Sequence, residues 1–436
     1  MPTVAMVRSR ILRLPLHSRM KIKGLRWYIV GLLCLVTAFN YLDRQTLALL
    51  AGTLEKDWGI TTIQYSYITA AWLISYTIMN IVSGRLIDFL GTRRGLALFV
   101  SLWSVADALH ALARTLLQFS FCRFLLGAAE AANFPAGVKA VAEWFPMRER
   151  ALAVGIFNSG TAIGAALAAP VVVWITIHMG WRYTFIVGAA LSASWLVAWL
   201  AIYRVPRQHP WLHPDELALI EQDGRSETKL KPVPLRCILS RPEAWGCIMA
   251  RILTDPISYL FAFWIPKFLQ QERGFDLAAI GKYYWMPYIG LALGNLASGL
   301  VPERLMRMGW SLNRSRKAVM FTASCMIAAC FILITRVPSP AWALGLLTSA
   351  MFFHAAWANM TLPAEVFPQR VVGSVTGCAG GISSLIGAVT TVAIGRTVMI
   401  GSFTPVFIIY SILPMAGFVA VCLLIEKLGV VREFPE

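Results

Sequence analysis

Residues 27–50 read WYIVGLLCLVTAFNYLDRQTLALL and form an almost wholly apolar run. As an α-helix this run is long enough to cross the hydrocarbon core of a bilayer, which is roughly 30 Å thick. Only Asp43 and Arg44 carry charges in it. Because a charge inside a bilayer is costly, such a residue is by default a candidate for function. The stretch therefore predicts a membrane protein and one position of its functional site.

The composition supports this interpretation. Of the 436 residues, 58% are hydrophobic and only 14% are charged, which is too little charge for the surface of a soluble protein of this size. A β-barrel would instead show short segments of alternating polarity. The eight cysteines have no paired spacing and are expected to pack as small apolar residues. We expect an all-α polytopic membrane protein with no catalytic residue, metal or cofactor.

Twelve apolar spans can be placed along the chain, and they predict two six-helix bundles joined by a charged linker. The linker has room for a short amphipathic helix around residues 215–222. The expected spans are 27–50, 64–86, 95–113, 116–142, 150–176, 183–204, 244–269, 280–304, 317–336, 340–362, 373–396 and 404–425. The expected domains are a basic tail 1–26, a bundle 27–204, a linker 205–243, a second bundle 244–425 and a tail 426–436.

The distribution of basic residues predicts the orientation. Lys and Arg gather in the tail before Trp27, in the linker and after the second, fourth and eighth spans. Cytoplasmic loops carry such an excess, so both termini are expected in the cytoplasm. The net charge of +17 is then mostly a signal of topology. Binding of nucleic acid is disfavoured because these charges are spread over separate loops.

An internal repeat supports the division into two halves. The segment AEWFPMRERALAVG at 142–155 aligns without gaps with AEVFPQRVVGSVTG at 364–377. Each copy leaves the fourth span of its half and enters the fifth. The halves are therefore expected to be parallel copies of one six-helix unit.

The segment GRLIDFLGTRRG at 84–95 resembles the loop signature of the major facilitator superfamily. The resemblance implies that it gates the conformational change and does not bind substrate. We expect Gly84 to permit close contact between helices and Asp88 to pair with a nearby arginine. Arg93 and Arg94 complete the predicted gate.

Other stretches resemble the anion:cation symporter branch of that superfamily, and most of all its carriers of hexuronates, galactonate and glucarate. They include NYLDRQTL, RFLLGAAEAANFPAGVKAVAEWFP and RILTDPISYLFAFWIPKFL. The resemblance implies proton-coupled uptake of a sugar acid anion across the bacterial inner membrane by alternating access, here by a monomer. The alternative is a facilitator or antiporter of another small organic carboxylate, which would need no titratable acid beside an arginine.

The charged residues of the first half fit that chemistry. Arg123 and Glu130 are seven residues apart, nearly two helical turns, and so share one helix face. A guanidinium matches a carboxylate with two parallel hydrogen bonds, so Arg44 and Arg123 are predicted to bind the substrate. Asp43 and Glu130 are predicted to compete for these arginines and to carry protons. Glu130, which lies deeper in an apolar helix, is the favoured carrier, and Asp43 is expected to gate Arg44.

Further polar and aromatic residues could complete the site. Tyr41 and Tyr76 could donate hydroxyls to a sugar, and Asn158 suits a polyol. Arg251 and Asp255 are expected mainly to form a latch that breaks the seventh span at Pro256. The alternative for all charged pairs is a structural ion pair between helices. The remaining candidates are Asn133, Arg251, Asp255, His354, Trp357, Asn359, Ser383 and Ser384.

Overall fold

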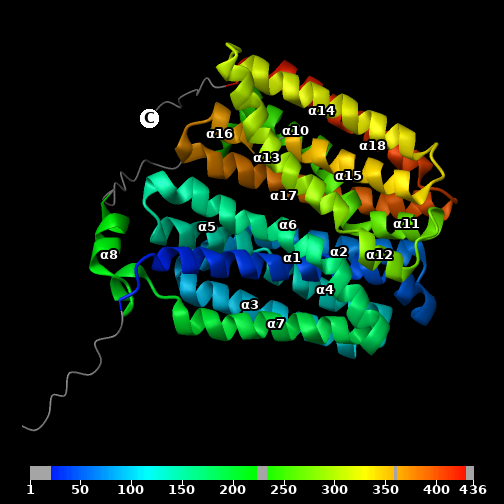
Figure 1. Cartoon of the computed structure of the whole chain (residues 1–436), viewed down its shortest axis with the longest axis horizontal. Coiled ribbons are helices and arrows are strands. Elements are labelled where there is room, and N and C mark those ends of the chain that lie inside the picture. The colour runs from blue at the N-terminus through cyan, green and yellow to red at the C-terminus, as the bar shows by residue number, and fades with distance from the viewer. Residues whose placement is uncertain (1–20, 223–232, 358–360, 429–436) are drawn as a thin grey trace, which may run out of the picture.

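The computed structural model describes residues 21–222, 233–357 and 361–428, and this part of the chain is a bundle of long helices (Figure 1). Apart from helices it contains one isolated bridge, between Ile22 and Leu212. The helices of the first half are α1 (Leu25–Trp58), α2 (Thr62–Leu90), α3 (Thr92–Leu112), α4 (Leu116–Glu130), α5 (Asn133–Trp144), α6 (Met147–Met179) and α7 (Trp181–Ile202).

The second half has the same character. The linker forms η1 (Pro206–Gln208), α8 (Pro214–Glu221) and α9 (Leu235–Leu239), and α8 confirms the predicted amphipathic helix. The second-half helices are α10 (Pro242–Phe263), α11 (Ile265–Glu272), α12 (Leu277–Tyr283), α13 (Met286–Arg307), α14 (Leu312–Ile334), α15 (Pro340–Ala356), α16 (Leu362–Val366), α17 (Gln369–Met399) and α18 (Thr404–Leu424).

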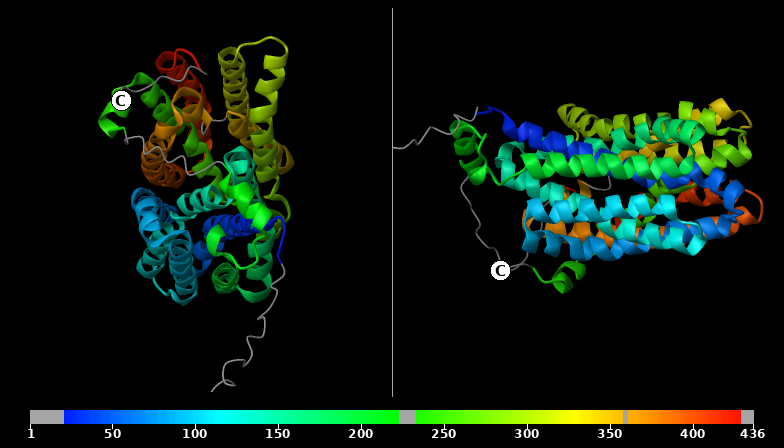
Figure 2. Two further views of the ribbon diagram at one scale, coloured as in Figure 1. Left: turned by 90° about the vertical axis from the view of Figure 1, so that its left-hand side faces the viewer. Right: turned by 90° about the horizontal axis from the view of Figure 1, so that it is seen from below.

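The helices form two bundles, which the left view of Figure 2 shows end-on. The two bundles have matching internal packing. In the first bundle α1 packs on α6, α2 on α4, and α3 on α7. In the second, α10 packs on α17, α13 on α15, and α14 on α18. In each half the first span packs on the fifth, the second on the fourth and the third on the sixth. The two halves therefore repeat one packing pattern. Between the bundles α2 packs on α17, and α6 packs on α12 and α13.

Nine helices in the described residues are individually long and apolar enough to cross a membrane. The expected spans four, seven and eight are each divided in two. Each division is followed within three residues by a proline, which lacks the N–H for the helical hydrogen bond and clashes with the preceding turn. The prolines concerned are Pro135, Pro266 and Pro287. Part of the expected span ten, residues 358–360, lies outside the described residues.

The predicted break at Pro256 is wrong. Helix α10 continues through Pro256 and ends at Phe263, with Trp264 as its C-cap, two residues before Pro266. A helix can absorb an isolated proline where neighbouring groups satisfy the freed carbonyl. The division of the seventh span therefore lies two turns beyond the expected position.

The linker holds the start of the first bundle. Glu216 of α8 accepts hydrogen bonds from the backbone N–H groups of Gly24, Leu25 and Arg26, at 2.8, 3.0 and 3.2 Å. It also accepts one from the Arg26 guanidinium at 2.8 Å. The first N–H groups of a helix have no partner within the helix, and the helix dipole favours a negative charge there. Glu216 therefore caps α1 from a distant part of the chain. The expected domain boundaries stay a prediction.

We call the end of the bundle that carries α8 the linker end, and the other the far end (Figure 1). In the described residues, an ion pair and two further side-chain hydrogen bonds join the bundles at the far end. Lys267 of α11 pairs with Glu55 of α1 and donates to Thr62 at 2.8 Å. Tyr65 donates to the backbone oxygen of Phe263 at 2.5 Å. The structure is therefore closed at the far end.

We expect Lys267→Ala to favour opening of the far end. Lys267 is 1% exposed, and removing one partner of a buried ion pair typically costs about 3–5 kcal/mol. A shift of only about 1.4 kcal/mol changes a population ratio tenfold. The reporter is Ser66→Cys, in a variant without the native cysteines, because Ser66 is buried against Gly395 of the other bundle. The measurement is the rate of maleimide labelling.

The exchanged pair Glu55→Lys/Lys267→Glu should return the labelling rate toward that of the parent. Arg307→Ala is the control, because it removes an exposed ion pair with Glu303 within α13. An unchanged labelling rate in Lys267→Ala would show that this pair does not hold the far end closed.

Candidate functional site

Arg44 lies at the centre of the candidate site, within a cage of aromatic rings. Its guanidinium carbon is 4.5 Å from the ring centre of Tyr41, 4.6 Å from that of Trp72 and 5.0 Å from that of Tyr76. Trp72 and Tyr76 are stacked on each other, since they are one turn apart on α2. A cation over aromatic faces is stabilised without being neutralised. The cage therefore holds the positive charge in place and leaves its hydrogen-bond donors available.

Glu130 faces Arg44 from α4. The nearest carboxylate oxygen is 3.8 Å from the guanidinium, and the same oxygen accepts a hydrogen bond from the Trp72 indole at 3.1 Å. The other oxygen of Glu130 and Nε of Arg44 have no partner in the described residues. Arg44 also donates a long hydrogen bond to Asn40, at 3.4 Å. The pair is thus close but loosely bonded, and an incoming anion could replace the carboxylate.

The pairing differs from the prediction. Asp43 and Arg44 were expected to act together, but successive residues on a helix point in different directions. Asp43 turns into the first bundle, toward Asp107 of α3, where both carboxylates lie against Gly188. Arg44 turns toward Glu130. Asp43 thus lies beside Asp107 in this conformation, and the expectation that it gates Arg44 stays a prediction.

Arg123 lies behind Arg44 and is buried more deeply. Its side chain is 1% exposed, against 11% for Arg44. It donates one long hydrogen bond, of 3.5 Å, to the backbone oxygen of Arg44, and its Nε and Nη1 have no partner among the residues that the structure describes. Its electrostatic contacts include Glu130, Asp107 and Asp43. In this conformation Arg123 faces the acids of its own bundle, and direct contact with a substrate stays a prediction.

The second bundle faces the cage with a polar network. Tyr76 is close enough to Arg251 and Tyr259 of α10 to interact electrostatically with both. Arg251 bonds Asp255 at 2.9 Å and the backbone oxygen of Thr376 at 3.3 Å. This pair does not break the helix, and it joins α10 to α17.

Two adjacent serines of α17 complete the network. Ser383 donates to Asp255 at 2.8 Å, and Ser384 lies 3.1 Å from the Tyr259 hydroxyl. The two predicted serines and the predicted Arg251 and Asp255 therefore lie together, around a tyrosine that the sequence analysis missed.

Other candidates are placed differently. Ser258 donates to or accepts from His354 at 2.7 Å, next to the network. Trp357 is buried, and its indole donates to Ser324 at 2.9 Å, so a contact between Trp357 and a substrate stays a prediction. Asn133 donates to Thr37 at 3.0 Å, which joins α5 to α1. Asn158 is exposed on α6, and Asn359 lies outside the described residues.

The predicted gate at the linker end is assembled differently from the expectation. A side chain at Gly84 would meet no atom within 4 Å, so this glycine permits no close contact here. Asp88 pairs with Lys139 of α5 at 2.8 Å and not with an arginine. Arg93 donates to the backbone oxygen of Leu200, and Arg94 is exposed. These contacts brace helices within one bundle, and a gating role stays a prediction.

The sequence analysis missed several residues of the site. Asp107 is an acid within the apolar span 95–113, which was the same signal that selected Asp43. Trp72 precedes Tyr76 by one turn, so the spacing could have paired them. The missed residues are Asn40, Trp72, Asp107, Ser258 and Tyr259.

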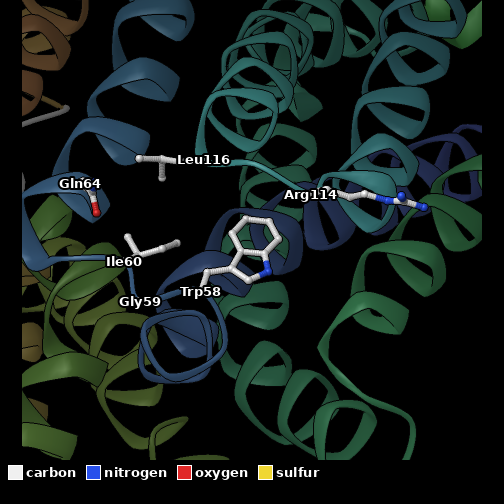
Figure 3. Close-up of a pocket in the computed structure, with 6 residues that line it drawn as sticks. All are labelled: Trp58, Gly59, Ile60, Gln64, Arg114 and Leu116. Carbon is white, nitrogen blue, oxygen red and sulfur yellow. The ribbon is translucent and has the colours of Figure 1, made fainter.

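A separate hollow lies at the far end. Its volume is about 270 Å³, and Arg114 is the only charged residue among those that line it. Figure 3 shows the Arg114 side chain extending away from Ile60 and Gln64. None of the predicted site residues lines this hollow, and it has no acid to pair with a cation. Its lining residues are Trp58, Gly59, Ile60, Gln64, Arg114 and Leu116.

Two bacterial proteins are similar along most of their lengths. A hexuronate transporter of Escherichia coli strain K12 is 36% identical over 93% of this chain and 95% of its own. A galacturonate transporter of Dickeya chrysanthemi is 37% identical over 80% of this chain and 99% of its own. Proteins with these names are transporters, not enzymes.

Solved structures share the fold at low identity. A D-xylose–proton symporter superposes with a TM-score of 0.70 at 15% identity, over 93% of this chain and 99% of its own. An inward-facing bacterial homologue of the lysosomal transporter Spinster gives 0.69 at 17%, over 93% and 96%. Residues 33–391 match the Major Facilitator Superfamily. This chain of apolar helices is therefore a multi-pass membrane protein that belongs to the Major Facilitator Superfamily.

Proposed function

We propose that this protein imports a sugar acid anion, in the first place a hexuronate, together with protons. One observation carries the proposal: the caged guanidinium of Arg44 lies 3.8 Å from the carboxylate of Glu130, with donors left unpaired. The names of the hexuronate and galacturonate transporters that resemble this chain support the class of substrate.

Arg44 is proposed to bind the substrate carboxylate. A guanidinium can donate two parallel hydrogen bonds to it, in a geometry that an ammonium cannot reproduce. The rings of Tyr41, Trp72 and Tyr76 offer apolar faces to the C–H groups of a sugar, and the two hydroxyls can bond its oxygens. From the second bundle, Arg251 and Tyr259 approach Tyr76 and could contact the distal part of the molecule.

Glu130 is proposed to couple the substrate to the proton. An ionised Glu130 competes with the sugar acid for Arg44, because both are carboxylates. A protonated Glu130 no longer neutralises Arg44, so the anion can take its place. Proton and anion then enter the site together, and the pair of them adds no net charge to a buried site, where charge is costly.

Alternating access is proposed to follow from the contacts between the bundles. The far end is closed by Lys267, Glu55 and Tyr65, whereas no such pair joins the described residues of the two bundles at the linker end. Transport requires a second state in which these far-end contacts break. We expect a monomer to change between the two states when its site holds both proton and anion and is electrically neutral.

A facilitator or antiporter of another small organic carboxylate is the alternative. It would use Arg44 in the same way, but substrate movement would not depend on a proton. The loose contact between Arg44 and Glu130 favours the symporter, because a permanent structural ion pair would be closer and more fully hydrogen-bonded.

We expect the linker end to face the cytoplasm of the bacterial cell, with the protein in the inner membrane. Lys139 and Arg94 lie at that end, and basic segments are retained on the cytoplasmic side. A reporter enzyme that works only in the cytoplasm should be active when it is fused after Glu436, and one that works only in the periplasm should be inactive there. Activity of a periplasmic reporter at the same position would reverse the proposed orientation.

Arg44→Lys should weaken substrate binding although it keeps the charge. The lysine ammonium lacks the planar pair of donors that a guanidinium offers to a carboxylate. Stacking of the Arg44 cation on the aromatic rings can contribute up to about 2 kcal/mol, which corresponds to somewhat more than tenfold in affinity. Arg44→Ala should abolish binding. Affinity is measured with purified protein and a hexuronate.

Arg182→Lys is the control, since Arg182 stacks on Trp181 at 4.3 Å, away from the cage. Normal affinity in Arg44→Ala would exclude Arg44 as the carboxylate receptor.

Glu130→Gln should separate binding from coupling. The amide resembles the protonated acid and cannot release a proton, so the variant should exchange substrate between the two sides of a vesicle but fail to accumulate it against a gradient. The control is Glu303→Gln, which changes an exposed acid on α13. If Glu130→Gln still accumulates substrate in response to a pH step, Glu130 is not the proton carrier.

A further inference from the structure

A second pair of acids lies inside the first bundle, where α1, α3 and α7 meet. A Cβ atom added to Gly188 would be 2.7 Å from Oδ1 of Asp43 and 2.7 Å from Oδ2 of Asp107. These two oxygens are therefore separated by no more than twice that distance. Asp43 is 3% exposed and Asp107 is 1% exposed. Only a glycine at position 188 leaves room for both carboxylates at this crossing.

The two carboxylates lack other hydrogen-bond donors. One oxygen of Asp43 and both oxygens of Asp107 have no partner in the described residues. Ionised carboxylates only accept hydrogen bonds, so they cannot satisfy each other. Two like charges at this separation also repel strongly in a buried site. One proton placed between the two acids would remove the repulsion and supply the missing donor.

The surroundings contain one positive charge that can balance such a pair. The described electrostatic contacts of Asp43 and Asp107 are with each other, with Glu130 and with Arg123. Within the described part of the chain, Nε and Nη1 of Arg123 are buried without a partner. His110, one turn along α3, donates from Nδ1 to the backbone oxygen of Ala106 at 2.7 Å, and its Nε2 is buried without a partner among the same residues. From α7 the pair meets Gly188, which cannot titrate.

We propose that Asp107 is the partner of Asp43, and that the two side chains hold one exchangeable proton between them as part of proton coupling. The proton comes from water, binds one carboxylate oxygen of the pair and later returns to water on the other side; no other bond forms or breaks. With the proton, the pair balances Arg123; without it, one negative charge is in excess. The proton state therefore acts on α4, the helix that carries both Arg123 and Glu130.

This inference rests on the proposed function, but it can be tested separately in purified wild-type protein. Near neutral pH, the infrared absorbance of the C=O stretch of protonated carboxylic acids should contain a contribution from one acid of this pair. Asp43→Asn and Asp107→Asn should each remove that contribution, since a lone acid beside Arg123 ionises. The double variant should remove no more than either single variant, because only one proton is shared.

The transport measurement uses the same variants. Asp107→Asn should lose proton-driven accumulation of a hexuronate, retain exchange across the vesicle membrane, and change the pH dependence of exchange in the same direction as Asp43→Asn. Asp215→Asn is the control, since Asp215 is an exposed acid of α8 in the linker. It should leave the infrared band and the pH profile unchanged.

Gly188→Ala tests the geometry without changing any titratable group. The added methyl group would push the carboxylates apart and should reduce the shared-proton band. Gly31→Ala is its control, because a Cβ there would meet no atom within 4 Å. If Gly188→Ala does not fold, the aspartate variants still decide the question.

Two outcomes separate this inference from the proposed function. If the wild type moves protons with a hexuronate, and Asp107→Asn alters neither the band nor the pH profile, the inference is overturned. Additive losses of the band in the two single variants would also overturn it, since the acids would then hold separate protons. If the band behaves as expected but a hexuronate moves without protons, the proposed function fails and the acid pair stands.

Discussion

The site depends on one constraint, which is the cost of keeping the guanidinium of Arg44 between apolar helices. A single buried charge is unfavourable unless it is paired and hydrogen-bonded. Here the aromatic cage stabilises the charge, and Glu130 pairs with it at 3.8 Å without saturating its donors. A tighter ion pair would be more stable and would not yield to a substrate. The incomplete pairing is thus what makes the charge usable.

The rest of the first bundle follows from this arrangement. Adjacent residues on α1 point in different directions, so Asp43 and Arg44 take part in two separate polar clusters on different faces of one helix. Arg44 lies on the face of α1 toward the second bundle, and Asp43 lies at the buried junction with Asp107. Arg123 lies between the two, with one hydrogen bond to the backbone of Arg44 and electrostatic contacts to the acids. A change of charge in either cluster therefore alters the electrostatic interactions of the same short stretch of α1 and α4.

Much of the fold could be predicted, because apolar length, loop charge and an internal repeat each act locally along the chain. Helices within the described residues lie close to all twelve expected spans, and the paired packing of the two bundles matches the repeat. The breaks before Pro135, Pro266 and Pro287 were missed, since the apolar pattern continues through them. Within the site, charged residues in apolar spans could be identified individually. Their partners could not, because contacts such as Arg44 with Glu130, or Asp43 with Asp107, depend on how separate helices are rotated against each other.

The most direct test of the central claim follows protons and sugar acid at the same time, in vesicles that contain the purified protein. Adding a hexuronate outside, with no pH gradient imposed, should draw protons inward with it, and an imposed inward proton gradient should drive accumulation. Both effects should disappear in Glu130→Gln, while exchange of labelled substrate continues. Entry of the hexuronate with no proton movement, at a rate that a pH gradient leaves unchanged, would contradict the account.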